Sequence, residues 1–448
     1  MTHRLDADTA VGPLLWRLST LLLGVGLLVV GVGLLFSVLG LRAGLADFSS
    51  ITLGLVTSAY FAGFVLGTYA CPVLIRKVGH IRAFAALASL ASTMPILHAF
   101  WIDPWFWGVL RLVTGVCMVG LYIVIESWLN ALAHNALRGR LFAVYMAVNF
   151  GALALGQWLI LVGDRLGFVP FALVSVMFSF ALLPITLTEV SEPAPVDAPT
   201  FSLRNLYQAS PMGMAGALTS GLMTGAFYGM SAVFGKSLGF SDAGVASFMA
   251  AAILGGAAFQ WPVGNYSDRH DRRIVLLWVC LLGACVSGLC FFLAQYGVDA
   301  IDTADALIPL ALLLGGLIFS IYGLSVAHVN DVIDSSRLVE FTGGLLLLHG
   351  VGAAIGPVLA GVLMDLAGPS SLMLFYAAAM AAMALYAFLR LKAAAPVAPE
   401  HKADFVAMGA GSQVVLQMDP RGPVEDGSNG PAPGASAAAG SEGHPPGP

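Results

Sequence analysis

Arg111 and Glu126 are charged residues within a long apolar stretch that runs from Trp105 to about Asn130. A cation inside a membrane helix costs roughly 2.5 to 3.5 kcal/mol, so it normally faces a partner or a water-filled cavity. At about 100° per residue, Arg111, Gly115 and Tyr122 fall within about 40° of one another on a helix. This face could recognise an anionic or zwitterionic solute. The arginine could equally serve as an internal counter-ion or extend to the outer interface.

Glu126 lies near the inner end of the same stretch. A carboxylate at that depth is either neutral, and so able to carry a proton, or ionised and held by a cation. Arg138 and Arg140 follow closely in the sequence, and Lys77 lies on a loop of the same side. Of these two roles for Glu126, we favour the ion pair, which would close an inner gate. Proton carriage stays open as the alternative.

A second charged cluster lies between two later apolar segments, in the run Gly264 to Arg273. Asp268 stands beside Arg269 and close to two further arginines. An acid at a helix end beside arginines can make charge-assisted hydrogen bonds in one conformation and lose them in another. A simple excess of cations on the inner side would explain the arginines but not Asp268. We therefore expect gating roles for Asp268, Arg269 and also Asp331.

Other polar side chains recur within the apolar segments, where they could line the path of a solute or a proton. His328 is a lone imidazole, a group whose unperturbed pKa is near 6.5, although a histidine that only packs between helices is nearly as good an interpretation. With Arg111, the predicted pathway residues are Tyr122, Asn149, Gln157, Thr224, Tyr228, Tyr322, His328, Asn330 and His349.

The elements that must position these side chains follow from composition. The 448 residues are 58% hydrophobic and 10% charged, against about 25% charge in soluble proteins, and the mean hydropathy is +0.87. A water-soluble enzyme is excluded. The net charge of -5, without a basic run interleaved with aromatics, gives a nucleic-acid partner no support. An odd number of cysteines without a CxxC pair argues against a metal site, and no cofactor is expected.

Twelve apolar segments are long enough to span a bilayer, which takes about 20 residues each. With the N-terminus inside, alternate loops place sixteen lysines and arginines on the inner side and three on the outer side. Because cations favour the cytoplasmic side, both termini are predicted to be cytoplasmic. The fold class is an all-α membrane protein of twelve transmembrane helices.

The chain divides into two similar halves. At an offset of 200 residues Gly115 aligns with Gly315 and Tyr122 with Tyr322, and at 192 residues Gly63 aligns with Gly255. Such internal similarity is typical of duplicated transporter folds. We predict a six-helix half over 1–190, a cytoplasmic linker over 191–210, a second six-helix half over 211–395 and a mostly disordered cytoplasmic tail over 396–448.

The run Gly264-Asn-Tyr-Ser-Asp268-Arg269-His-Asp-Arg272-Arg273 resembles the loop signature of the major facilitator superfamily, with Asp271 where a second glycine usually stands. The corresponding first-half loop has Pro72 and Arg76 at the usual glycine and acid positions. Arg111 to Gly115 resembles the R-x-x-x-G motif of span four. Several stretches further resemble one bacterial branch, the YcaD-type transporters: Glu126-Ser-Trp-Leu, Arg138-Gly-Arg140, Gly156-Gln157, Gln260-Trp-Pro262 and Tyr322 through Asp331.

The resemblance implies a secondary transporter that moves a small solute across the bacterial inner membrane by alternating access, driven by protons or another ion. Its fold would be two pseudo-symmetric halves, with spans one, four, seven and ten around a central cavity. We expect a monomer in the lipid bilayer, with a solute and protons as partners. A non-transporting sensor or partner subunit is the alternative. A membrane-embedded enzyme is the third class, and the sequence has no HExxH motif to support it.

Overall fold

The computed structural model describes residues 3–132, 138–164, 167–187, 193, 202–297, 303–333, 337–393, 402 and 405. Every regular element within these ranges is a helix. The α-helices are α1 (His3–Leu45), α2 (Ser50–Val78), α3 (His80–Phe100), α4 (Pro104–Leu132), α5 (Arg138–Trp158), α6 (Val169–Phe180), α7 (Leu182–Thr186), α8 (Leu203–Ala209), α9 (Pro211–Ser237), α10 (Asp242–Arg269), α11 (Arg272–Tyr296), α12 (Thr303–Asn330), α13 (Leu338–Ala367) and α14 (Ser371–Ala393). A short 3-10 helix, Leu159–Leu161, follows α5.

Eleven candidate spans in the described chain are long and apolar enough to cross a membrane. Helices form there because a bilayer offers backbone groups no water, so each span must satisfy its own hydrogen bonds. The helix α9 is not among the eleven, although its 27 residues are sufficient in length. Its sequence interleaves glycine with serine and threonine, which lowers its hydropathy. A twelfth membrane crossing, by α9, therefore stays a prediction.

The segment predicted as a cytoplasmic linker contains the short helix α8. Ser202 begins it, because its side chain accepts a hydrogen bond from the backbone N–H of Asn205. The next helix starts in the same way, with Ser210 accepting from the N–H of Gly213 and Pro211 in the first turn. Local capping therefore orders the approach to α9.

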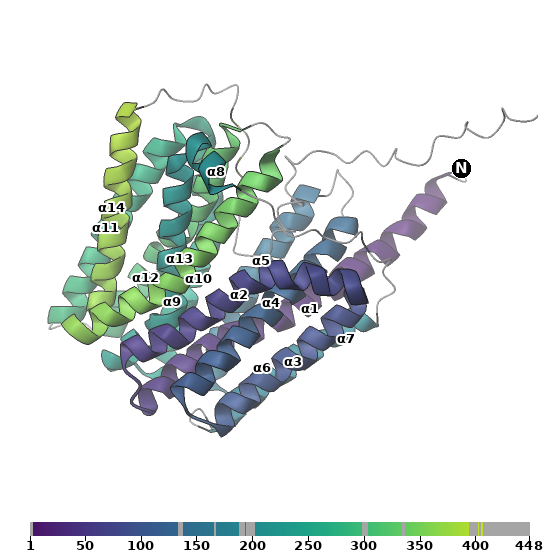
Figure 1. Cartoon of the computed structure of the whole chain (residues 1–448), viewed down its shortest axis with the longest axis horizontal. Coiled ribbons are helices and arrows are strands. Elements are labelled where there is room, and N and C mark those ends of the chain that lie inside the picture. Colours follow the sequence, from purple (N-terminus) through teal and green to yellow (C-terminus); the bar gives the residue numbers. More distant parts are fainter. Residues whose placement is uncertain are drawn as a thin grey trace, which may run out of the picture.

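Helix packing repeats along the chain. In the first set of helices, α1 to α7, α2 packs on α4, α1 on α5, and α3 on both α4 and α6. In the second set, α8 to α14, α10 packs on α12, α9 on α13, and α11 on both α12 and α14. Figure 1 shows the two sets as separate groups, purple and blue on one side and teal to green on the other.

Glycines at matching positions allow these helices to approach closely. A Cβ added at Gly63 would lie 2.0 Å from the carbonyl oxygen of Leu112, and one at Gly255 would lie 1.8 Å from that of Leu312. Both contacts are too short for any side chain, so α2 and α4 meet in the same way as α10 and α12. The partners Leu112 and Leu312 are themselves 200 residues apart, the offset found in the sequence.

The two sets meet through α2 with α13, α5 with α10 and α1 with α9. At the end where α2 begins, the carboxylate of Asp365 accepts hydrogen bonds from the backbone N–H groups of Ser50 (2.9 Å) and Ile51 (3.0 Å). Close backbone approaches follow at Gly54 against Pro357 and at Gly361 against Ser50. This end of the interface between the sets is therefore tightly closed.

Candidate functional site

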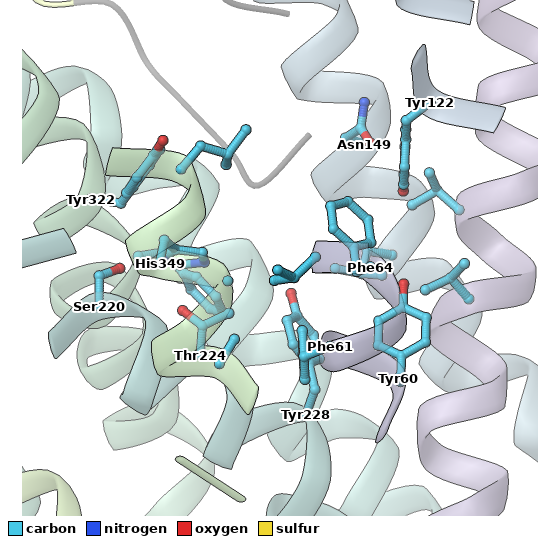
Figure 2. A pocket seen from close by; sticks show the side chains of 18 of the residues that line it. Tyr60, Phe61, Phe64, Tyr122, Asn149, Ser220, Thr224, Tyr228, Tyr322 and His349 are labelled. Atoms are coloured by element: carbon cyan, nitrogen blue, oxygen red, sulfur yellow. The ribbon is translucent and has the colours of Figure 1, made fainter. Parts of the chain in front are cut away.

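A cavity of about 150 Å³ lies between the two sets of helices. Figure 2 shows the hydroxyl-bearing side chains of Ser220, Thr224 and Tyr322 with His349 on one wall, and Tyr60, Phe64 and Tyr122 on the other. Its lining residues come from α1, α2, α4 and α5 of the first set and from α9, α10, α12 and α13 of the second. The site thus depends on how the sets are placed relative to each other.

Ten of the lining residues are aromatic. Across the interface, the rings of Phe36 and Tyr228 stack with centroids 4.9 Å apart. Phe36 also meets Tyr60 edge-on at 5.3 Å, and Tyr60 meets Phe61 at 5.1 Å. Rings in these arrangements leave flat apolar faces available to a solute.

Arg111 lies behind these rings. Its guanidinium carbon is 4.2 Å from the centroid of Tyr60 and 4.7 Å from that of Phe36. Both rings line the cavity, whereas the buried arginine is not among the lining residues. Its Nη2 has no hydrogen-bond acceptor within the described part of the chain. The structure therefore places the intramembrane cation one layer of side chains away from the cavity.

The predicted pathway residues fall into two groups. Six line the cavity: Tyr122, Asn149, Thr224, Tyr228, Tyr322 and His349. The other four, Arg111, Gln157, His328 and Asn330, are not lining residues. The side chain of Gln157 accepts a hydrogen bond from Ser37 and donates to the carbonyls of Gly33 and Leu153, each at 3.1 Å. The hydrogen bonds to Ser37 and Gly33 join α5 to α1, so Gln157 holds two helices together.

Glu126 is fully buried and accepts a 2.5 Å hydrogen bond from the hydroxyl of Tyr145. Tyr145 is a lining residue of the cavity, so the carboxylate connects to the cavity through one side chain. Lys77 and Arg140 are exposed, and the side chain of Arg138 lies outside the described part. The sequence did not single out Tyr145, which follows Glu126 by 19 residues on the next helix.

The charged loop between α10 and α11 is organised around Arg272. This buried guanidinium contacts Asp331 at 2.7 Å, Asp268 at 3.0 Å and the hydroxyl of Ser267 at 2.8 Å. It ties together the end of α10, the beginning of α11 and the residue that follows α12. Arg269, which we predicted as a gating residue, is exposed. Sequence reasoning treated Arg272 only as an inner-side cation, because Asp331 is 59 residues away.

Asp271 occupies the position where the resemblance places a glycine, and it caps α11. Its carboxylate accepts hydrogen bonds from the backbone N–H (3.0 Å) and the side chain of Arg273. Burial raises the pKa of Asp271, but the hydrogen bonds and charge of Arg273 outweigh it and hold the pKa below its usual value. This cap stabilises the fold at neutral pH, and the stabilisation is lost when the pH falls through the lowered pKa.

Two residues of the predicted disordered tail contact the same loop. The backbone N–H of Phe405 donates to Asp268 at 2.9 Å, and the ammonium of Lys402 donates to the carbonyl oxygen of His270 at 2.5 Å. The Phe405 ring lies against Gly264, where a Cβ would come within 2.1 Å of it. No pattern in the tail's composition pointed to this contact.

The family model of the Major Facilitator Superfamily matches residues 21–327, with a second match over 213–424. The chain belongs to the major facilitator superfamily. An MFS-type transporter from Enterobacter sp. (strain 638) is 29% identical over 324 residues, 70% of this chain and 80% of that protein. The YcaD MFS-type transporter of Salmonella newport is 28% identical over 330 residues, 71% of this chain and 81% of that protein. These findings confirm the predicted resemblance and identify a multi-pass membrane transporter.

Solved structures with the same fold are more distant in sequence. The nucleoside transporter NupG superposes with a TM-score of 0.67 at 15% identity, covering 84% of this chain and 99% of NupG. A bacterial homolog to the human lysosomal transporter Spinster gives a TM-score of 0.64 at 13% identity, covering 91% and 97% of the two chains. At such identities the likeness establishes the fold alone.

Proposed function

We propose that this chain is a secondary active transporter that carries a small solute across the bacterial inner membrane by alternating access, coupled to protons. The observation that carries this proposal is the cavity between two sets of helices whose contacts close one end of the interface. A site at such an interface can change its accessible side when one set rocks against the other.

The matched packing supports twelve spans in two related halves, 1–190 and 211–395, joined by 191–210 and followed by the tail from 396. The helix α9 supplies the seventh span, because it packs on α13 as α1 packs on α5. With both termini cytoplasmic, the end closed by Asp365 and Ser50 is the outer end. The protein then stands in an inward-facing state, and it functions as a monomer.

The cavity-lining members of the predicted pathway contact the solute, and the cavity-lining Tyr145 links them to Glu126. A buried carboxylate bonded to a side chain of the cavity is a chemically suitable proton carrier. Gate closure by Glu126 with Lys77, Arg138 or Arg140 on the inner side is the second role proposed for this residue. The ion pairs of Asp268 and Asp331 with Arg272 keep the inner ends of α10, α11 and α12 together during rocking.

Alternating access can be tested by distance measurements between spin labels. One pair replaces Leu45 and Leu366, exposed residues at the proposed outer end, and the other replaces Lys77 and Arg337, exposed residues at the inner end. The exposed Cys285 is first changed to serine. We expect a second population in which the outer distance is longer and the inner distance shorter, with a fraction that changes with pH. A single unchanged distance for both pairs would refute rocking.

A further inference from the structure

Four side chains on one wall of the cavity each have a buried polar atom with no hydrogen-bond partner among the described residues. Ser220, Thr224, Tyr322 and His349 are all at least nine-tenths buried and line the cavity. Within the described chain, the two hydroxyls of α9, the phenol oxygen of Tyr322 and Nδ1 of His349 are unsatisfied. Buried polar groups are normally hydrogen-bonded, so this wall is built to receive partners from the cavity.

Several buried hydroxyls elsewhere in the helices satisfy themselves locally, although those of Ser58 and Ser287 have no partner within the described chain either. Thr114, Ser127, Ser320 and Ser325 each donate to the carbonyl of the residue four positions earlier, at 2.6 to 2.7 Å. That is the ordinary way for a serine or threonine to satisfy itself inside a helix. Ser220 and Thr224 make no such bond and remain available to a solute.

The opposite wall offers flat aromatic surface, although the hydroxyls of Tyr60 and Tyr122 and the amide of Asn149 also belong to it. Phe64 and Tyr60 lie there with Tyr122, facing the polar wall across the cavity, while Phe61 and Tyr228 lie between the walls in Figure 2. A planar ring can stack on these faces, since offset and edge-on aromatic contacts are favourable beyond the area they bury. One wall therefore suits a flat ring and the other suits hydrogen-bonding groups along its edge.

The described lining of the cavity is uncharged, which disfavours the binding of ions. Among the lining residues that the structure describes there is no aspartate, glutamate, lysine or arginine. Arg111 lies behind Phe36 and Tyr60, so a solute carboxylate would lose its water without reaching a cation, which is costly. A solute ammonium would lose its water without meeting an acid among the described lining residues.

We propose that the cavity binds uncharged, flat aromatic solutes that carry hydrogen-bonding groups along one edge. This proposal rests on the transport function proposed above, whose cavity it uses. Ser220, Thr224, Tyr322 and His349 hold the polar edge, and the aromatic residues of the first set hold the ring. Arg111 keeps its ring partners in place and does not bind the solute.

The test measures how far two series of small compounds stabilise the purified full-length protein against heat. Within each series the compounds differ in charge or in aromaticity. The first is 2-phenylethanol, phenylacetate, phenethylamine and 2-cyclohexylethanol; the second is indole-3-ethanol, indole-3-acetate and tryptamine. We expect the neutral aromatic alcohols to raise the unfolding midpoint at millimolar concentration, and the charged and saturated compounds to have little effect. A larger shift from a charged member, or none from either aromatic alcohol, would overturn the proposal.

Matched variants separate binding in the cavity from partition into detergent. Thr224→Val and Tyr322→Phe each remove one hydroxyl and should weaken binding about five-fold, the effect of one hydrogen bond. Ser325→Ala is the control, because the hydroxyl of Ser325 donates to the carbonyl of Ile321 in its own helix. Equal stabilisation of all variants would overturn the proposal. Binding of an aromatic alcohol without its flux in vesicles would instead refute transport, whereas flux of charged solutes alone would refute only the solute class.

Discussion

The contact of Asp365 with the beginning of α2 should set the balance between the two orientations of the transporter. Its carboxylate accepts from two backbone N–H groups, at 2.9 and 3.0 Å, at the positive end of the α2 dipole. Because the side chain is exposed, we take the value of an ordinary helix cap, about 1 kcal/mol. Asp365→Ala should therefore raise the ratio of outward-open to inward-open protein about five-fold.

Labelling of a cysteine at Thr57 by an impermeant maleimide measures this ratio, since Thr57 is buried at the closed outer end beside Gly229. In a Cys285→Ser background, Asp365→Ala should speed labelling about five-fold, in proportion to the outward-open fraction. Asp103→Ala is the matched control: Asp103 caps α4 at 2.8 Å within the first set alone. An unchanged rate in Asp365→Ala, or the same increase in both variants, would refute the reasoning.

Three further changes test individual contacts. Arg111→Lys should lower the free energy of unfolding by about 1–2 kcal/mol, because a planar guanidinium over two rings is lost, and an unchanged denaturation curve would contradict the observed stacking. Tyr145→Phe should lower the free energy of unfolding by about 1.5–3 kcal/mol in the native protein, but by less than half of that in a Glu126→Gln background. Equal losses in the two backgrounds would show that the acceptor, Glu126, is not charged. Phe405→Ala removes the ring that lies against Gly264 and should speed hydrogen exchange over residues 264–271; unaltered exchange would show that this ring contributes nothing to the loop.

The helical segments were largely predictable because a bilayer permits few structures. The sequence has no charged residue between Asp242 and Asp268, where α10 lies, or between Arg273 and Asp299, where α11 lies. Both follow from length and apolarity alone. The helix α9 falls below the hydropathy criterion because its glycines and hydroxyls serve packing and the cavity, although its charge-free length had placed it among the twelve predicted spans.

The site was less predictable, since helical periodicity gives direction only within one helix. That Arg111 and Tyr122 share a face of α4 could be calculated, but the rings of Phe36 and Tyr60 come from α1 and α2 and separate Arg111 from the cavity. Ser220 could have been found one turn before Thr224. Contacts that join distant segments, such as Arg272 with Asp331, depend on packing that single-sequence patterns do not encode.

Solute movement into sealed vesicles tests the central claim most directly and needs no known substrate. Vesicles containing the purified protein are incubated with a mixture of uncharged and charged metabolites, and their contents are measured by mass spectrometry with and without an imposed proton gradient. Thr224→Trp fills the cavity, whereas Leu254→Trp adds the same side chain at an exposed position of α10. The account predicts that at least one solute enters with the native protein and with Leu254→Trp but not with Thr224→Trp, and accumulates under the gradient. Identical contents in vesicles of all three proteins would contradict it.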